Sequence, residues 1–281
     1  AYDYQVQVAS DAGFTNIVAQ TTTRDTSWTP TQPLNSGSSY FWRVIARNPC
    51  PLGVTPELFA DGFEPAVSGG GSQAVSSVQS FATQSLPGDC PVGATVTSHY
   101  NEGFEAAGLP SGWSQVAGGS GTNSWAVTTA FPQTGTRALQ GLTPASVSDQ
   151  RVQSAEITIP TISGGTQSAL LTFWQRQNME RRTAGGCWDG GVIELCNAGG
   201  TCTAVTALNL PYDGALTTPN PAAPTPAWCG DPRPYGRTAV NVSSFIGQTL
   251  RIRFRVTSDD SVNRPEGWNI DNLEVKSCNA P

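Results

Sequence analysis

Apolar and polar side chains alternate over several stretches of the chain, and a period of two is the pattern of a half-buried β-strand. The alternation is clearest over residues 2–9, 39–48 and 249–256, where Val, Ile, Tyr, Phe and Trp recur. Short groups of Ser, Asp, Gly and Pro, such as residues 10–13, separate these stretches and are typical of turns. The sequence therefore predicts an all-β protein built from antiparallel strands.

The composition agrees with short strands joined by turns. Only 13% of the 281 residues are charged, and the chain holds 30 glycines and 21 prolines. At roughly 100–200 residues per domain, this length predicts two domains. The net charge of −6 argues against nucleic-acid binding, because neutralising phosphates requires clustered Lys and Arg. Since no stretch is long and apolar enough to span a bilayer, we expect no membrane span either.

The first predicted domain, residues 1–85, resembles a fibronectin type III domain of the kind found in bacterial extracellular proteins. The resemblance is carried by the alternating strands over residues 2–48 and by the closing segment 77–83. It implies an immunoglobulin-like sandwich in which Tyr40 and Trp42 lie on a central strand. It also implies a core filled by Val6, Val8 and Phe14.

Two features of residues 1–85 depart from that family. The chain begins at what would be the third strand, so the first strands of the sandwich are missing and an edge is exposed. We expect these strands to come either from an upstream domain of the same precursor or from neighbouring subunits by strand addition. The second departure is a long insert at residues 49–74, and an insert of this length is usually functional or disordered.

The second predicted domain, residues 86–281, carries an ordered set of landmarks. Along the chain these are Gly103-Phe-Glu105, Trp113, Trp125, Asp149, the apolar runs 170–174 and 191–195, the alternating run 249–256, and Gly267-Trp-Asn-Ile-Asp271. The set resembles the MAM-like jelly-roll domain of the immune inhibitor A and cleaved-adhesin type, found at the C-terminus of secreted bacterial proteases. The resemblance implies a jelly-roll β-sandwich.

The same resemblance implies a calcium site. Jelly rolls of this kind place their first and last strands side by side, which would bring Glu105 and Asp271 together, with Asp149 added from a loop. Carboxylates and backbone carbonyls supply the oxygens that calcium binds at about 2.3–2.6 Å. A single Asp more often caps a turn or lies in solvent, so only the family pattern favours a cation here. It also favours a second metal or loop-bracing pair, Glu180 and Asp189, whereas we interpret Asp259 and Asp260 as a solvated turn.

The seven cysteines lie in Gly- and Pro-rich loops and at strand ends, without Cys-x-x-Cys spacing. Disulfides in an oxidising compartment are therefore favoured over zinc, and we expect a secreted, extracellular or cell-surface protein. Spacing alone does not determine connectivity. Within the expected jelly roll, the pairs would be Cys90–Cys278 at its ends, Cys196–Cys202 around a turn, and Cys187–Cys229 between long loops. Cys50 is left for an intermolecular bond or an upstream partner.

Nothing in the sequence points to a catalytic centre. His99 is the only histidine, so a His-Glu-x-x-His zinc motif cannot occur and a Ser-His-Asp triad has little basis. No Gly-x-Ser-x-Gly motif is present. Paired carboxylates can hydrolyse glycosides, but no pair here is distinguished from the calcium candidates. We therefore expect a protein that is not an enzyme.

Aromatic residues in loops raise a carbohydrate-binding alternative, because aromatic faces stack on sugar rings and jelly rolls often serve as lectins. The candidates are Trp188, Tyr212, Trp228 and Tyr235. The competing interpretation, which we favour, is that these large rings cover the core.

These observations favour a non-catalytic, calcium-stabilised adhesion or substrate-binding accessory module. It would form the C-terminal region of a larger secreted bacterial protein, such as a protease, and its ligand would be a protein or glycan surface. Two alternatives remain open: a subunit of an extracellular filament completed by strand donation from a neighbour, and a carbohydrate-binding, lectin-like module.

Overall fold

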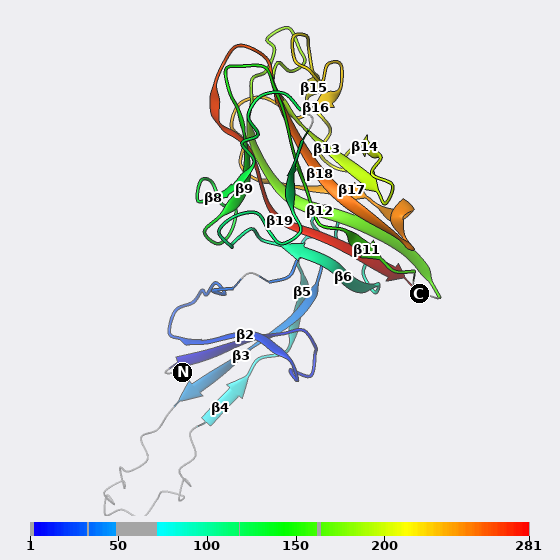
Figure 1. Ribbon diagram of the computed structural model, residues 1–281. Helices are drawn as coiled ribbons and strands as arrows, with labels where there is room; N and C mark the ends of the chain where they lie inside the picture. The colour runs from blue at the N-terminus through cyan, green and yellow to red at the C-terminus, as the bar shows by residue number, and fades with distance from the viewer. Residues whose placement is uncertain (1–2, 33, 49–71, 118, 162–163, 281) are drawn as a thin grey trace, which may run out of the picture. The chain divides into compact units, whose positions relative to one another are not determined.

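The computed structural model describes residues 3–32, 34–48, 72–117, 119–161 and 164–280. Within these residues the regular structure is β-strand, apart from one short 3-10 helix, η1 (Ser243–Phe245). The all-β prediction is confirmed. No helix in this described part is long and apolar enough to cross a membrane. The chain divides into two compact units, Ala1–Leu86 (unit 1) and Pro87–Pro281 (unit 2) (Figure 1).

The described residues of unit 1 form one antiparallel five-stranded sheet. Strand β1 lies between β2 and β3, and β3 also pairs with β4 and β5. The bounds are β1 Asp3–Ala9, β2 Ile17–Thr23, β3 Ser39–Asn48, β4 Ser72–Val75 and β5 Gln79–Ala82. Tyr40 and Trp42 lie on β3 and so do fall on an inner strand. Most of the predicted insert, residues 49–71, and the unassigned Cys50 lie outside the described residues.

Only part of the core expected for unit 1 is buried. Val8 and Phe14 are buried, and the Arg43 guanidinium lies over the Phe14 ring at 4.1 Å from its centroid. Val6 is half-buried, and Trp42 is 36% exposed. One face of the sheet is therefore left open, because the described residues of unit 1 supply no second sheet to cover it.

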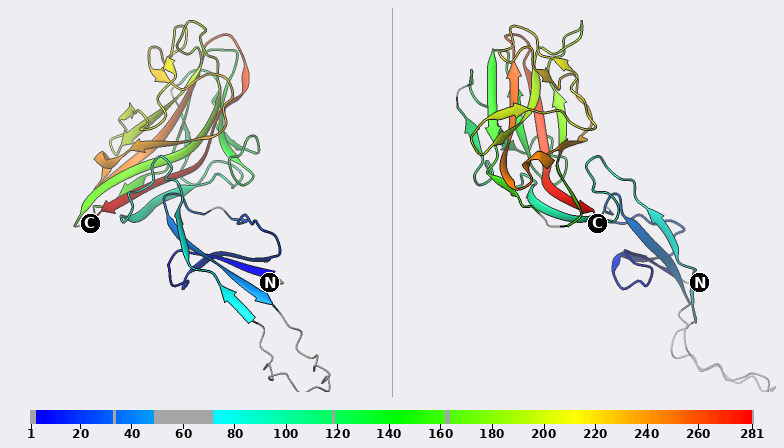
Figure 2. Two further views of the ribbon diagram at one scale, coloured as in Figure 1. Left: turned by 180° about the vertical axis from the view of Figure 1, so that it is seen from behind. Right: turned by 90° about the vertical axis from the view of Figure 1, so that its right-hand side faces the viewer.

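Unit 2 is a β-sandwich of two six-stranded sheets. Sheet I has the order β14-β13-β18-β10-β7, with β11 also on β18, and sheet II has the order β17-β12-β19-β9-β8, with β6 also on β19. The long strands β12, β18 and β19 run through the middle of the unit (Figure 2). The bounds are β6 Thr95–Glu102, β7 Ser114–Val116, β8 Ala126–Thr128, β9 Ala138–Thr143, β10 Ser148–Gln153, β11 Ile157–Ile159, β12 Thr166–Asn178, β13 Gly190–Asn197, β14 Cys202–Ala204, β15 Gly214–Ala215, β16 Pro226–Ala227, β17 Gly236–Asn241, β18 Gln248–Ser258 and β19 Arg264–Ala280.

An aromatic cluster fills the space between the two sheets. Phe254 on β18 meets Trp268 on β19 edge to face, with ring centroids 5.5 Å apart, and Trp125 packs 5.9 Å from Trp268. The buried Trp268 indole donates to Gln175 Oε1 at 2.7 Å, which satisfies its only polar atom. Gly191 lies against that ring, since an added Cβ would come within 2.6 Å of it. Each such buried ring is worth about 1.5–3 kcal/mol of transfer free energy.

Three disulfides join the same cysteine pairs that the sequence interpretation proposed. Cys90–Cys278 connects residues 188 apart and ties the segment before β6 to the end of β19. Cys187–Cys229 and Cys196–Cys202 connect residues 42 and 6 apart. The first bond therefore encloses almost the whole of unit 2.

Loop length predicts which disulfide matters most for stability. Replacing Cys90 and Cys278 together by Ser should lower the free energy of unfolding by about 5 kcal/mol, because the unfolded chain regains the entropy of a very long loop. The matched control, Cys196→Ser with Cys202→Ser, should lose about 3 kcal/mol less in the chain-entropy model. Urea unfolding of both double variants measures the difference. Equal losses of unfolding free energy would contradict the prediction that Cys90–Cys278 contributes more to stability.

Candidate functional site

Asp271, the acid expected on the last strand, lies where β19 changes its pairing partner, and Glu105 follows the end of β6. The first half of β19 pairs with β9, up to Ile270, and the second half pairs with β6, from Leu273 onward. On the other side the register with β12 shifts at the same place, and Asn272 adopts a positive φ of 46°. Asp271 is therefore held at a bulge, next to the gap between β9 and β6.

Asp271 and Glu105 both hold the short loop 133–136 that enters this gap. Asp271 Oδ2 accepts hydrogen bonds from the backbone N–H groups of Gln133 at 2.8 Å and Thr134 at 3.2 Å. Glu105 Oε2 accepts from the N–H of Thr136 at 2.9 Å and from its hydroxyl at 2.8 Å. Gly135 has a positive φ of 64°, which favours glycine, and a Cβ added there would displace the Glu105 carboxylate from its present position. The two acids thus converge on one loop.

The two carboxylates also repel each other. Burial raises the pKa of Asp271, the N–H groups of Gln133, Thr134 and Asn272 oppose that shift, and the charge of Glu105 adds to it. The hydrogen bonds from Thr136 lower the pKa of Glu105. A cation between them would remove this repulsion. Asp271 Oδ1 also accepts from the Asn272 N–H at 2.7 Å, and carboxylate oxygens are the ligand type that calcium prefers.

Asp149 lies in a different arrangement from the one expected. It is on β10 in sheet I, and its side chain alternates with the core-facing Gln150 and Val152. Its oxygens accept from Arg255 Nε at 2.8 Å and from an Arg151 nitrogen at 2.6 Å. Two guanidinium groups already neutralise this carboxylate, so its geometry does not support the expected grouping with Glu105 and Asp271.

The other expected pair, Glu180 and Asp189, gains a third member. Their carboxylates cluster with that of Asp259, one ligand oxygen from each lying within 4.8 Å of the others. Asp259 is only 4% exposed, so its interpretation as part of a solvated turn was wrong; Asp260 beside it is exposed. The sequence contained no signal for this association, because the three acids come from separate strand ends.

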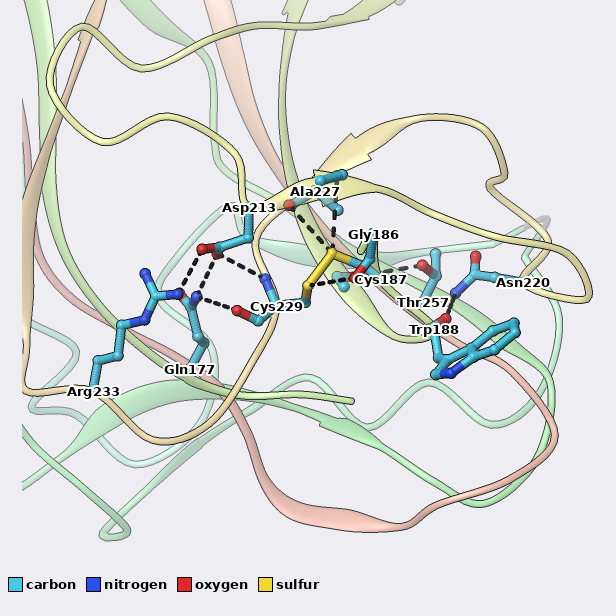
Figure 3. Close-up of a disulfide and its surroundings, with 12 residues drawn as sticks. Gln177, Gly186, Cys187, Trp188, Asp213, Asn220, Ala227, Cys229, Arg233 and Thr257 are labelled. Carbon is cyan, nitrogen blue, oxygen red and sulfur yellow. Dashed lines mark hydrogen bonds and ion pairs between the residues drawn. A yellow bond between two sulfur atoms is a disulfide. The ribbon is translucent and has the colours of Figure 1, made fainter. Parts of the chain in front are cut away.

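The Cys187–Cys229 disulfide is braced by an acid that sequence reasoning missed. Asp213 Oδ2 accepts from the Cys229 N–H at 3.1 Å and from the Gln177 amide at 2.9 Å, and Oδ1 accepts from Arg233 at 2.6 Å (Figure 3). These bonds fix the loops on either side of the disulfide. Asp213 therefore serves as a structural brace.

The four candidate sugar-stacking rings do not form one platform. Trp228 is fully buried, its indole donates to Leu210 O at 3.2 Å, and its ring centroid lies 4.4 Å from that of Tyr212. Both rings pack in or against the core. Tyr235 is half-buried and donates to Phe131 O at 2.5 Å. Trp188 is half-buried beneath the Arg182 guanidinium, 5.4 Å from the ring centroid.

His99 occupies a structural position on β6. A ring nitrogen lies 2.9 Å from the Ser277 hydroxyl on the neighbouring strand β19, and burial lowers the pKa of the imidazole. This contact links the first and last strands of unit 2.

Unit 1 carries an apolar groove on its open face, with a volume of about 720 Å³. Side chains of β1, β3 and β5 form its floor, including Val6, Trp42, Val44 and Phe81, and Trp28 and Leu34 form its wall. The groove therefore coincides with the sheet face that no second sheet covers among the described residues of unit 1.

No family model matches the chain, and no curated protein matches it. Among solved structures it is similar to a cleaved adhesin domain of Lys-gingipain from Porphyromonas gingivalis, at 16% identity and a TM-score of 0.39, over 64% of this chain and 99% of that one. It is also similar to the xylan-binding domain from Paenibacillus barcinonensis, at 12% identity and a TM-score of 0.36, over 70% and 99%. A Stig cyclase from Fischerella gives 14% identity and a TM-score of 0.37, over 66% and 100%. At such low identities and TM-scores, these likenesses carry no argument about what this chain binds or catalyses.

Removing the Asp149 carboxylate tests its role as an ion-pair partner. We expect Asp149→Ala to lower the free energy of unfolding by about 3 kcal/mol, because a half-buried guanidinium loses its closest partner. Among the described residues Arg255 then keeps its ion pair with Glu194, at 3.5 Å. The stability that calcium adds should be unchanged. Urea unfolding with and without calcium measures both quantities, and a smaller calcium effect would contradict this role.

Proposed function

We propose that this chain is a non-catalytic, calcium-stabilised binding module of an exported protein, and that its ligand is a protein or glycan surface. The observation that carries the proposal is the convergence of Glu105 and Asp271 on the loop 133–136 at the gap between β9 and β6. A bound cation would relieve the repulsion between two carboxylates that hold the same loop.

The acids of unit 2 support a scaffold rather than a reaction centre. Asp271, Asp213 and Glu105 accept hydrogen bonds from backbone N–H groups and so hold loops in place. Loops fixed on a rigid sandwich are the usual carriers of binding. The three disulfides agree with an oxidising, extracellular setting.

In this proposal Glu105 and Asp271 hold the calcium ion. Asp271 positions Gln133 and Thr134, Glu105 positions Thr136, and Gly135 leaves room for the Glu105 carboxylate. The cation contributes positive charge between two acids that otherwise repel. Its expected effect is on loop order and stability, with no part in any chemical step.

The Glu105→Gln variant tests the calcium role. At a calcium concentration about 100 times its Kd, the wild-type chain should gain about 2.7 kcal/mol of stability relative to chelator. The variant should bind calcium at the Asp271 site at least roughly tenfold more weakly, because a charged ligand is lost. Thermal melts with calcium and with chelator measure the gain. Glu156→Gln, which changes an exposed acid, is the matched control; an equal calcium effect in both variants would contradict the role of Glu105.

A second candidate function is assembly into a filament by strand donation between neighbouring copies. The apolar groove of unit 1 favours it, because an apolar sheet face is stable only when another layer covers it. An alternating apolar strand from a neighbour would fit such a floor.

The Val44→Asp variant tests this second candidate. A charge on the groove floor should prevent docking of an apolar strand, so the wild type should associate with rising concentration and the variant should remain monomeric. Gln20→Glu on β2, outside the groove, is the control for added charge. Sedimentation velocity over a range of concentrations reads the outcome, and a wild type that stays monomeric throughout argues against donation.

A further inference from the structure

Three acids gather at one end of unit 2, where strands of both sheets finish or begin. Glu180 follows the end of β12 in sheet II. Asp189 directly precedes β13, and Asp259 directly follows β18, both in sheet I. The backbone also joins these segments, since the N–H groups of Trp188 and Asp189 both donate to Glu180 O at 3.1 Å. The cluster therefore bridges the two layers of the sandwich.

The spacing of the three carboxylates matches the coordination shell of one calcium ion. One oxygen from each acid lies within 4.8 Å of the other two. Oxygens bound to calcium at about 2.3–2.6 Å can be at most about 5 Å apart, so a single ion can contact all three. The magnesium shell is smaller and keeps several waters, which fits a cage of protein carboxylates less well.

Asp189 provides a second, independent sign of a missing partner. Its side chain is fully buried, and Oδ2 finds no hydrogen-bond partner among the described residues. Oδ1 accepts from the Asp259 N–H at 3.0 Å. The nearby Thr143 hydroxyl contacts Arg264 O at 3.5 Å and helps to lower the pKa of Asp189, but it does not come within hydrogen-bond geometry of Oδ2. A buried carboxylate oxygen without a donor requires another source of positive charge.

The surroundings do not supply that charge. Burial raises the pKa of Asp189 to about 7, and repulsion from Asp259 and Glu180 contributes to the shift. The Ser261 hydroxyl lies 3.0 Å from Glu180 Oε2 and 2.8 Å from Asp259 Oδ1, but it has only one proton to donate. The Ser261 N–H also donates to Asp259 Oδ1 at 2.9 Å, so within the described part of the chain the oxygen of this cluster left buried without a donor is Asp189 Oδ2.

We propose that Glu180, Asp189 and Asp259 form a cation site for calcium, separate from the site assigned to Glu105 and Asp271. The bound ion joins the end of β12 to the start of β13 and the end of β18, and so ties sheet I to sheet II. It also fixes the segment between Cys187 and Asp189, which carries the half-buried Trp188 and the disulfide to Cys229 (Figure 3). This inference does not depend on the proposed function, because it rests on different residues.

Calorimetric titration with calcium chloride alone tests the site on the full chain, with disulfides intact and metal first stripped by a chelator. Glu180→Gln should weaken one binding event at least roughly tenfold and leave the event assigned to Glu105 unchanged. Glu105→Gln should do the reverse, so failure of one site is distinguishable from failure of the other. Asp260→Asn, beside the cluster but exposed, is the matched control. Wild-type binding by both Glu180→Gln and Asp259→Asn would overturn the proposal.

The Asp189→Asn variant separates a metal-binding role from a purely structural one, because only metal binding makes its effect on the melting temperature depend on calcium. Removing a buried charge should raise the melting temperature above that of the wild type in chelator, because the repulsion is relieved. In calcium the order should reverse, because the variant has lost a ligand. If Asp189→Asn has the higher melting temperature in both conditions, a proton rather than a metal balances the cluster, and the proposal is wrong.

Discussion

The pairing of β19 is the constraint on which the rest of unit 2 depends. This strand runs beside β12 along almost its whole length, and on its other side it pairs first with β9 and then with β6. The bulge at Asp271 and Asn272 allows that change of partner while keeping Trp268 and Ile270 before it, and Leu273 and Val275 after it, in the core. Without the bulge, one of these pairs would face outward, since side chains alternate along a strand.

The same bulge explains why an acid can occupy the middle of a central strand. Asp271 is fully buried, yet backbone N–H groups of the loop 133–136 and of Asn272 donate to its oxygens. A buried charge is stable only when paired or hydrogen-bonded. Asp149 meets the same requirement with two arginines, and Asp213 meets it with Arg233 and two N–H donors. The cluster of Glu180, Asp189 and Asp259 differs from these, because its partners are mainly other acids.

Several features of this structure could be predicted from the sequence because they follow from local pattern. The alternation over residues 249–256 gave strand β18, and turn-rich spacing around Cys196 and Cys202 was compatible with a disulfide. Contacts between neighbouring strands were harder to predict. Asp149 was assigned to the wrong neighbours because its partner Arg255 depends on the register of β10 against β18, which no local pattern encodes. Trp228 was a candidate ligand residue because its Pro-rich context resembles an exposed loop, whereas the loop folds back and buries the ring.

The two units use apolar surface in opposite ways, and the contrast bears on function. In unit 2 the rings of Phe173, Phe254 and Trp268 lie between two sheets and are fully buried. In unit 1 the equivalent alternation on β1 and β3 places Val6, Trp42 and Val44 on an open groove, because the described residues form one sheet. An apolar sheet face is stabilised when another layer covers it. Unit 2 therefore closes its core with its own two sheets, whereas the described residues of unit 1 leave this apolar face on a single sheet.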